Sequence, residues 1–226
     1  AASDVYKRQP KSYFQSYGHD KFHSERGMPN VMNYESMLLT FGTDKIEPVN
    51  TSETPNPVYG LHDYTLGGGK GSSAQAASSF NDMIEKAFGR PRDAKQFAEW
   101  AQWINYDGYR AIFEGRSEHR RGMLLWMSHS AWPSMVWQTY DYYFDPNAAY
   151  FGCKKASEPL HIQWNPLRDD IEVVNYHAFD RTGLTATASL FNQDGTLQWT
   201  RETKLDIKED PVSYTHLRAH ETLMNL

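Results

Sequence analysis

One glutamate lies at the end of a short predicted strand, beside residues that could take part in acid–base or nucleophilic catalysis. The stretch from Lys21 to Gly27 has the pattern of a strand that ends in a glycine turn, and it places Glu25 beside His23 and Arg26. A carboxylate at such a place is a candidate acid, base or nucleophile. The two neighbours offer charge and hydrogen bonds, although solvated roles suit these positions equally well. We take Glu25 as the candidate catalytic residue and His23 as a candidate binding residue.

Aromatic and small polar residues follow a second apolar segment. The run 122–127 is continuously apolar, which is typical of a strand buried on both faces, and 128–134 is the loop after it. The candidate substrate-binding residues there are Trp126, Ser128, His129 and Trp132. Two indoles beside a carboxylate suit a sugar ring and an oxocarbenium-like transition state. Spacing alone favours a plainer interpretation, with both tryptophans in the core and Glu25 a solvated loop acid.

Helices are predicted between and after these segments, over residues 30–41, 73–88, 93–115 and 145–155. Asp93 and Gln96 form a capping box at the start of the third helix, and Pro146 suits the N1 position of the fourth. Residues 43–72 are predicted to form a long loop, whose glycines lack the spacing of a phosphate-binding loop. A helix followed by a buried strand is the repeating unit of an α/β barrel.

The pattern changes to alternation at about residue 160. Apolar and polar residues alternate over 160–165, 184–190 and 204–208, with a turn centred on Asp194-Gly195. Short strands separated by turns suggest a β-sandwich, for which about 50 residues remain, roughly half of an immunoglobulin-like domain. The predicted fold class is therefore α/β plus all-β, with a boundary close to Pro159.

The composition describes a folded chain and argues against several other classes. Of 226 residues, 39% are hydrophobic and 23% are charged, which is too apolar for a disordered protein. The net charge of −5 gives no reason to expect nucleic acid or a membrane surface as a partner, and no apolar run is long enough to span a bilayer. Histidine spacing disfavours a metal site, no cofactor is predicted, and Cys153 has the features of a small buried apolar residue.

Both ends of the chain look foreign to the fold. Residues 1–9 and 211–226 show no period that fits the elements beside them, and both closely resemble translated sequencing-adapter sequence. We exclude these artefactual tails from fold reasoning, as one excludes a fusion scar. The natural segment is then about 10–210, and its missing start and stop signals carry no biological meaning.

An ordered series of motifs resembles one enzyme family. The motifs are FHSERG at 22–27, LWMSHSAWPS at 125–134, DYYFDP at 141–146, YFG at 150–152 and EPLH at 158–161. In this order they resemble the C-terminal half of the catalytic barrel of glycoside hydrolase family 2, above all its exo-β-glucosaminidase and β-mannosidase branches. The resemblance implies the last two β/α units of a (β/α)8 TIM barrel over 10–158, then a truncated immunoglobulin-like β-sandwich over 159–210.

The resemblance also implies a mechanism. Glu25 matches the nucleophile of a retaining double displacement on terminal β-mannosides or β-glucosaminides, and Trp126 matches the aromatic floor of the sugar subsite. The family's acid/base lies on the fourth barrel strand, so this chain is expected to lack it and to be inactive in isolation. Relatives often carry Asn-Asn where this chain has His129-Ser130, which affects hydroxyl recognition. The implied partner is a glycoside or oligosaccharide, and the implied location is periplasmic or extracellular in a bacterium.

Other functions are compatible with the same residues. One is a non-catalytic carbohydrate-binding or interaction module that stacks its aromatic side chains on glycans, and another is an α+β scaffold of unrelated role. A binding module needs no carboxylate at position 25, whereas a nucleophile does. The residues leave the sugar open among mannose, glucosamine, galactose and glucuronic acid, and they leave the oligomeric state open as well.

Overall fold

The chain divides into two compact units, Ala1–Ala156 and Ser157–Leu226, with the boundary just before Pro159. The computed structural model describes residues 13–14, 22–51, 53–54, 56–62, 81, 83–115, 122–135, 137–168, 170–209 and 214–218. Residues 1–9, the glycine run 67–71 and most of the helix predicted over 73–88 lie outside the described residues. No helix in the described ranges is long and apolar enough to cross a membrane.

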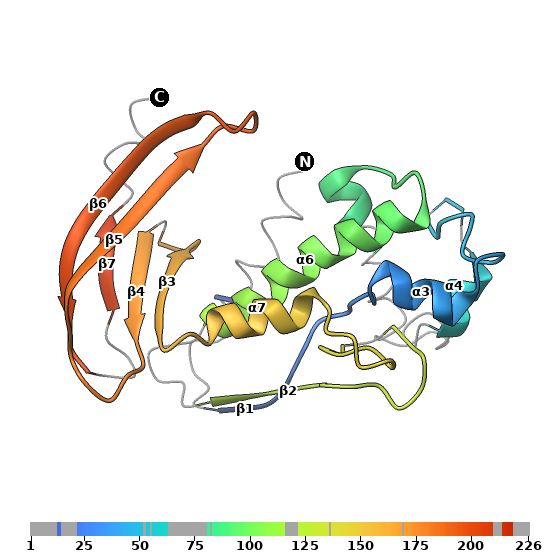
Figure 1. Ribbon diagram of the computed structural model, residues 1–226, viewed down its shortest axis with the longest axis horizontal. Coiled ribbons are helices and arrows are strands. Elements are labelled where there is room, and N and C mark those ends of the chain that lie inside the picture. The colour runs from blue at the N-terminus through green and yellow to red at the C-terminus, as the bar shows by residue number, and fades with distance from the viewer. Residues whose placement is uncertain are drawn as a thin grey trace. The chain divides into compact units, whose positions relative to one another are not determined.

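Helices are the main regular elements in the described part of the first unit, which also contains one short parallel pair of strands (Figure 1). Its elements are β1 (Phe22–Arg26), α3 (Tyr34–Phe41), α4 (Pro57–His62), α6 (Ala94–Glu114), β2 (Gly122–Leu125) and α7 (Ala148–Ala156). The long helix α6 carries much of the core, because Phe97, Ala101 and Ile112 on one of its faces are almost fully buried. Helix α7 packs closely beside α6, and a Cβ at Gly152 would come within 2.5 Å of the Tyr106 carbonyl oxygen.

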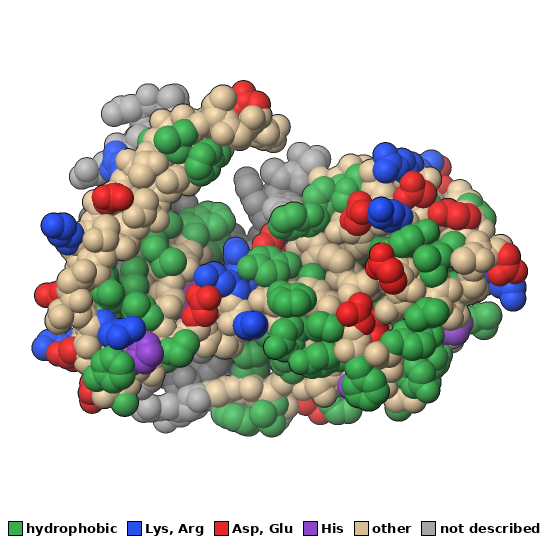
Figure 2. Space-filling model, viewed as in Figure 1, with side chains coloured by type: hydrophobic (Ala, Val, Ile, Leu, Met, Phe, Trp, Pro, Cys, Tyr) green, Lys and Arg blue, Asp and Glu red, His purple; other side chains and the backbone are tan. Residues whose placement is uncertain are grey.

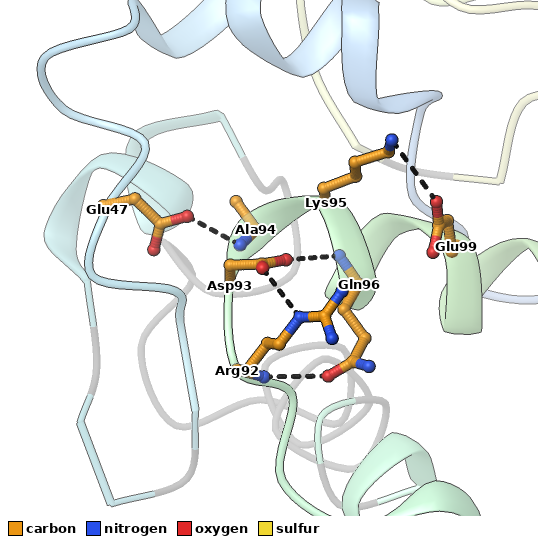
Figure 3. A network of polar contacts seen from close by, with 7 residues as sticks. All are labelled: Glu47, Arg92, Asp93, Ala94, Lys95, Gln96 and Glu99. Carbon is orange, nitrogen blue, oxygen red and sulfur yellow. Dashed lines mark hydrogen bonds and ion pairs between the residues drawn. The ribbon is translucent and has the colours of Figure 1, made fainter.

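The start of α6 is fixed by a small polar network (Figure 3). As predicted, Asp93 is the N-cap, and its carboxylate accepts the backbone N–H of Gln96 at 2.8 Å. The Gln96 side chain accepts the N–H of Arg92 at 3.0 Å, one residue earlier than in a capping box, and Glu47 accepts the N–H of Ala94 at 2.7 Å. The Gln96 hydrogen bond lowers the pKa of Asp93, so this cap stabilises the helix at neutral pH and weakens as the pH falls through that lowered pKa.

Two predicted helices start later than the sequence pattern indicates. Helix α3 begins at Tyr34 rather than near residue 30, because Asn30 and Val31 are engaged in buried hydrogen bonds to distant parts of the chain. Helix α7 begins at Ala148 rather than at residue 145, because the preceding Asp145 N–H is bound by a turn. The predicted loop over 43–72 was also wrong in part, since it contains α4.

The expectation that the strand after residue 122 is buried on both faces was wrong. β2 pairs with β1 in parallel, with Phe22 opposite Gly122 and Arg26 opposite Leu125. Leu124 is 56% exposed and Phe22 is 55% exposed. Large apolar side chains of this pair, which is the whole of the sheet in the described residues, therefore meet solvent.

The close approach of these strands depends on Gly27. A Cβ at this position would lie 2.1 Å from the Trp126 carbonyl oxygen and 3.1 Å from the Trp137 Cβ. We expect Gly27→Ala to destabilise the fold by about 3 kcal/mol, because backbone atoms cannot move aside cheaply. Urea unfolding measures this loss, with Ser24→Ala on the exposed face of β1 as the control. Equal stability of both variants would contradict it.

The second unit consists of antiparallel strands. They are β3 (Leu160–Asn165), β4 (Asp170–Asn175), β5 (Arg181–Phe191), β6 (Leu197–Ile207) and β7 (Tyr214–Arg218). One sheet has the order β3-β4-β7, and β5 and β6 form a hairpin with Leu184 opposite Leu205. The three alternating segments are strands as predicted, and the predicted turn between β5 and β6 has Gly195 at φ +84°, where glycine is favoured. Val173, Ala186 and Ile207 form a small buried cluster.

Strand β4 escaped the sequence analysis because polar residues interrupt its pattern. Glu172 on β4 is 2% exposed, and three neighbouring side chains bind its carboxylate. Gln163 and Asn165 donate to its carboxylate at 2.8 and 2.7 Å, and Arg168 forms an ion pair with it. A satisfied buried carboxylate therefore occupies a position that sequence pattern assigns to the surface.

The segment excluded from fold reasoning takes part in this sheet. β7 lies within 211–226 and pairs antiparallel with β4, with Asp170 opposite Arg218 and Val174 opposite Tyr214. Pairing of this kind uses backbone groups that any sequence carries. The artefactual origin of the tail stays a prediction.

Candidate active site

The backbone brings Glu25 next to Trp126. The two strands are parallel, so their carboxyl ends lie at the same edge, and the N–H of Trp126 donates to the Arg26 carbonyl oxygen at 2.8 Å. Trp126 therefore donates an inter-strand hydrogen bond to the residue that directly follows Glu25. The peptide bond after Trp126 is cis.

A bulge in β1 places Glu25 out of regular register. His23 pairs with Met123 and Arg26 with Leu125, so Ser24 and Glu25 together stand opposite one residue of β2. Bulges are common beside active sites, where they redirect a side chain. The Glu25 side chain is exposed, whereas His23 is half-buried. The sequence contains no signal for this bulge, because it arises from the pairing of two distant strands.

The tryptophans of the site do not belong to the core. Trp126 is 49% exposed and Trp132 is 44% exposed, and neither is part of the buried cluster of the first unit. This is the arrangement that a stacking surface requires and that a core position does not. Glu25 and both indoles thus keep surface available to a ligand.

The loop after β2 is folded back on the strand end. Met127 donates to the Trp137 carbonyl oxygen at 2.9 Å, and the Ser128 carbonyl oxygen accepts the N–H of Tyr140 at 2.8 Å. The Ser128 side chain is exposed, and His129 is half-buried in a bridge with Tyr140. Two of the predicted binding residues therefore lie on a rigidly bonded segment directly after Trp126.

Helix α4 holds the part of this loop that contains Trp132. His62, the last residue of α4, has its Nδ1 2.8 Å from the Pro133 carbonyl oxygen, and its own carbonyl oxygen accepts the Met135 N–H at 2.7 Å. The His62 and Trp132 rings lie 6.4 Å apart. No sequence pattern marks His62 as a residue that holds this loop, and the next residue, Asp63, lies outside the described residues.

Buried amides and a tyrosine support these loops from below. The Asn105 side chain donates to the Pro29 carbonyl oxygen at 2.9 Å, and the Asn147 side chain donates to the Gln138 carbonyl oxygen at 2.9 Å. Both asparagine side chains are buried. The Tyr109 hydroxyl lies 3.0 Å from the Met28 carbonyl oxygen and 2.8 Å from that of Trp137. Burial raises the pKa of Tyr109 well above its usual value, so it stays a donor at physiological pH.

One carboxylate lies where its sequence position does not suggest. A glutamate at the end of a helix is most simply a surface charge, but Glu114 is 7% exposed and pairs with Arg110, whose Nε lies 3.4 Å from its carboxylate. The partner one helical turn earlier provides the compensating charge. Glu35 is exposed on α3. No cluster of three or more metal-ligating side chains occurs in the described part of the chain.

Cys153 is expected to be unreactive in the folded chain. It lies on α7 against the core of the first unit, and burial raises the pKa of its thiol to about 12. An unfolded thiol has a pKa of about 8.5, so at pH 8 the folded chain holds about 10³-fold less thiolate. Alkylation by iodoacetamide should therefore be about 10³-fold slower in buffer than in denaturing urea. Similar rates in both conditions would contradict the burial of Cys153.

Comparison with known proteins gives relatives of one kind. No family model matches the chain. It is 40% identical over 124 residues to an exo-β-D-glucosaminidase of Amycolatopsis orientalis, which covers 52% of the chain and 12% of that protein. It is 37% identical over 155 residues to the enzyme of that name from Streptomyces avermitilis (65% and 17%). It is also 29% identical over 195 residues to a mannosylglycoprotein endo-β-mannosidase of Lilium longiflorum (82% and 20%).

Solved structures agree with these relatives. Exo-chitosanase CsxA of Amycolatopsis orientalis, in complex with PNP-β-D-glucosamine, superposes with a TM-score of 0.74 at 25% identity, over 92% of this chain and 25% of that one. A β-D-mannosidase from Dictyoglomus thermophilum gives a TM-score of 0.70 at 18% identity, which shows a shared fold alone. The chain spans no more than a fifth of the length of the three curated relatives. By sequence and by fold, the chain is therefore homologous to one part of the exo-β-D-glucosaminidases and β-mannosidases of glycoside hydrolase family 2.

Proposed function

We propose that the chain is part of a retaining exo-β-glycosidase that removes terminal β-linked glucosamine or mannose, with Glu25 as the nucleophile. One observation carries this proposal: an exposed carboxylate lies at a bulge near the carboxyl end of β1, one residue before Arg26, whose carbonyl oxygen accepts the N–H of Trp126, and the Trp126 indole is itself exposed. The relatives, whose names are those of β-glucosaminidases and β-mannosidases, support the substrate class.

The proposal assigns the two units to parts of a larger architecture. Residues 10–158 form the last two β/α units of a (β/α)8 barrel, and 159–210 begin an immunoglobulin-like sandwich. The parallel pairing of β1 with β2 supports the first assignment, because catalytic groups in such barrels lie at the carboxyl ends of strands. The antiparallel strands after Ser157 support the second.

Glu25 would act by double displacement. Its carboxylate attacks the anomeric carbon, the bond to the leaving oxygen breaks, and a glycosyl ester forms on Glu25. A second carboxyl group about 5 Å away protonates the leaving oxygen and then activates the water that hydrolyses the ester. We assign this second group to the length of the relatives that the chain does not span.

The remaining predicted residues would bind the sugar. Trp126 offers a flat face to the ring, and Trp132 closes the pocket from the loop held by α4. Ser128 and His129 present hydroxyl and imidazole groups directly after Trp126, and His23 lies two residues before Glu25. These polar groups suit the recognition of sugar hydroxyls.

Trapping of the ester tests the assignment of Glu25. The test uses a chimeric enzyme in which residues 10–210 replace the matching segment of the Amycolatopsis orientalis exo-β-D-glucosaminidase. A 5-fluoro-β-glycosyl fluoride of glucosamine or mannose slows hydrolysis of the ester more than its formation, so the labelled enzyme accumulates. Peptide mass mapping should find the label on Glu25. A label on another carboxylate would contradict the proposal.

A non-catalytic carbohydrate-binding module is the second candidate. The exposed aromatic side chains Trp126, Trp132 and Phe144 favour it, since they offer stacking surfaces regardless of chemistry. A module of this kind would bind sugar equally well with Glu25→Gln and would form no covalent label. The trapping experiment therefore separates the two candidates.

A further inference from the structure

Phe144 has a backbone conformation that bulky residues avoid. Its φ is +65°, and it is the only non-glycine residue in the described ranges with a positive φ. It is also 73% exposed, more than any other large hydrophobic side chain described. A bulky residue in this conformation is an outlier, and such strain persists where the surrounding structure enforces it, often at ligand sites.

Asp141 enforces the conformation of Phe144. Asp141 is fully buried, and one carboxylate oxygen accepts the N–H groups of Tyr143 at 2.9 Å and of Asp145 at 3.0 Å. Its carbonyl oxygen accepts the Phe144 N–H, and its own N–H donates to the Asp145 carbonyl oxygen, both at 3.0 Å. Asn33 anchors the far end of the turn by donating to the Asp145 carboxylate at 2.5 Å. Four backbone N–H groups and two backbone carbonyl groups are thus fixed around one exposed phenyl ring.

The ring of Phe144 lies against a predicted binding residue. Its centroid is 4.3 Å from that of His129, with the ring planes 14° apart. The Tyr142 ring also stacks on His129, with the two centroids 6.4 Å apart. His129 follows Trp126 by three residues, so the backbone positions of the two are at most about 11 Å apart. This aromatic surface of His129, Tyr142 and Phe144 is therefore within reach of a second sugar ring beside the one at Trp126.

We propose that this aromatic surface binds the sugar unit on the leaving-group side of the bond that is cleaved, which rests on the proposed function. Its flat faces carry polar groups at the imidazole and the Tyr142 hydroxyl, which suits the apolar face and the hydroxyl groups of a pyranose. Hydrophobic side chains also gather on the face of the first unit that Figure 2 shows. Binding would cost little conformational entropy in this loop, because the hydrogen bonds of Asp141 already fix its backbone.

The decisive variant is Phe144→Gly in the chimeric enzyme. Glycine adopts a φ of +65° without strain, so the loop should stay folded while the ring is lost. Two substrates are compared: the β-1,4-linked glucosamine disaccharide, which fills the leaving-group subsite, and β-glucosaminyl fluoride, which leaves it empty. We expect KM for the disaccharide to rise about three- to tenfold, the worth of one aromatic stacking contact, and KM for the fluoride to stay unchanged.

Matched controls separate this effect from others. Phe191→Gly removes another exposed phenyl ring, from the end of β5 in the second unit, and it should change neither KM. Phe144→Tyr keeps the ring and should restore the disaccharide KM. Loss of fluoride hydrolysis in Glu25→Gln reports on the proposed function itself. Failure of the two proposals is therefore distinguishable.

Two results would overturn the proposal. Equal KM ratios for Phe144→Gly and the unsubstituted chimera would show that the ring touches no sugar. A lower melting temperature with an unchanged ratio would show that Phe144 packs against another protein segment. A second measurement uses the chimeric enzyme with Glu25→Gln, which should leave the disaccharide uncleaved. Saturation-transfer NMR should show contacts to its reducing-end unit that the added Phe144→Gly removes, and equal or absent signals in both variants count against the proposal.

Discussion

Replacing Glu25 by Gln in the chimeric enzyme should lower kcat by about 10⁴-fold or more, because the attacking carboxylate is lost and no covalent path remains. The side chain is exposed, and glutamine has the same shape, so the fold should be unaffected. The measurement is the hydrolysis of nitrophenyl β-glucosaminide and β-mannoside under saturation. Unchanged kcat would remove Glu25 from the mechanism.

Chemical rescue makes the same prediction specific to a nucleophile. In Glu25→Gly the vacated space admits azide, which attacks the anomeric carbon from the side that the carboxylate used. The product should then be the α-glycosyl azide, of inverted configuration, whereas rescue of a lost acid/base would give the β-azide. Glu35→Gln, a change at an exposed carboxylate on α3, is the matched control and should leave kcat unchanged.

The 226-residue chain alone should show no turnover of glycosides. General acid–base assistance is typically worth about 10² to 10⁴ in rate. We place the second carboxyl group, which would provide this assistance, in the part of the relatives that this chain does not span. Phe22 and Leu124 are also exposed, so apolar side chains of β1 and β2 that the proposed barrel would cover are left in contact with solvent. The assay uses the two nitrophenyl glycosides, with the chimeric enzyme as the positive control.

Glycosyl fluorides separate the two causes of this inactivity. Fluoride leaves without protonation, so a chain that lacked only the acid would still be glycosylated at Glu25 by a glycosyl fluoride. We expect no labelling of the isolated chain, because an incomplete sheet does not assemble the sugar pocket. Turnover of the nitrophenyl glycosides at a rate comparable to that of the chimera would show that the acid/base assignment is wrong.

Local sequence was sufficient for elements whose signals lie within a few residues. The N-cap at Asp93 and the end of α6 at Gly115 follow from helix chemistry inside single turns. The hairpin of β5 and β6 follows from alternation around the glycine at position 195. The motifs from 22 to 161 also sufficed to predict the kind of relatives that the comparisons found.

Long-range packing decided what the sequence left undetermined. The start of α3 depends on Asn105, which accepts the N–H of Val31 from a distant helix, and the burial of Glu172 on β4 depends on Gln163 and Asn165 of the neighbouring strand. A pattern of polar and apolar residues assigns each side chain by its own type. It therefore misplaces every buried polar group whose partner lies elsewhere in the fold.

The site shows the same division. The sequence by itself determined that Glu25 and Trp126 end two strands and that a loop of small and aromatic residues follows the second. Only the tertiary structure decided that the strands pair in parallel with a bulge at Glu25, and that Asp141 holds Phe144 against His129. Strand register and loop closure are fixed by hydrogen bonds between backbone groups, which are the same in every residue and leave no mark in the sequence.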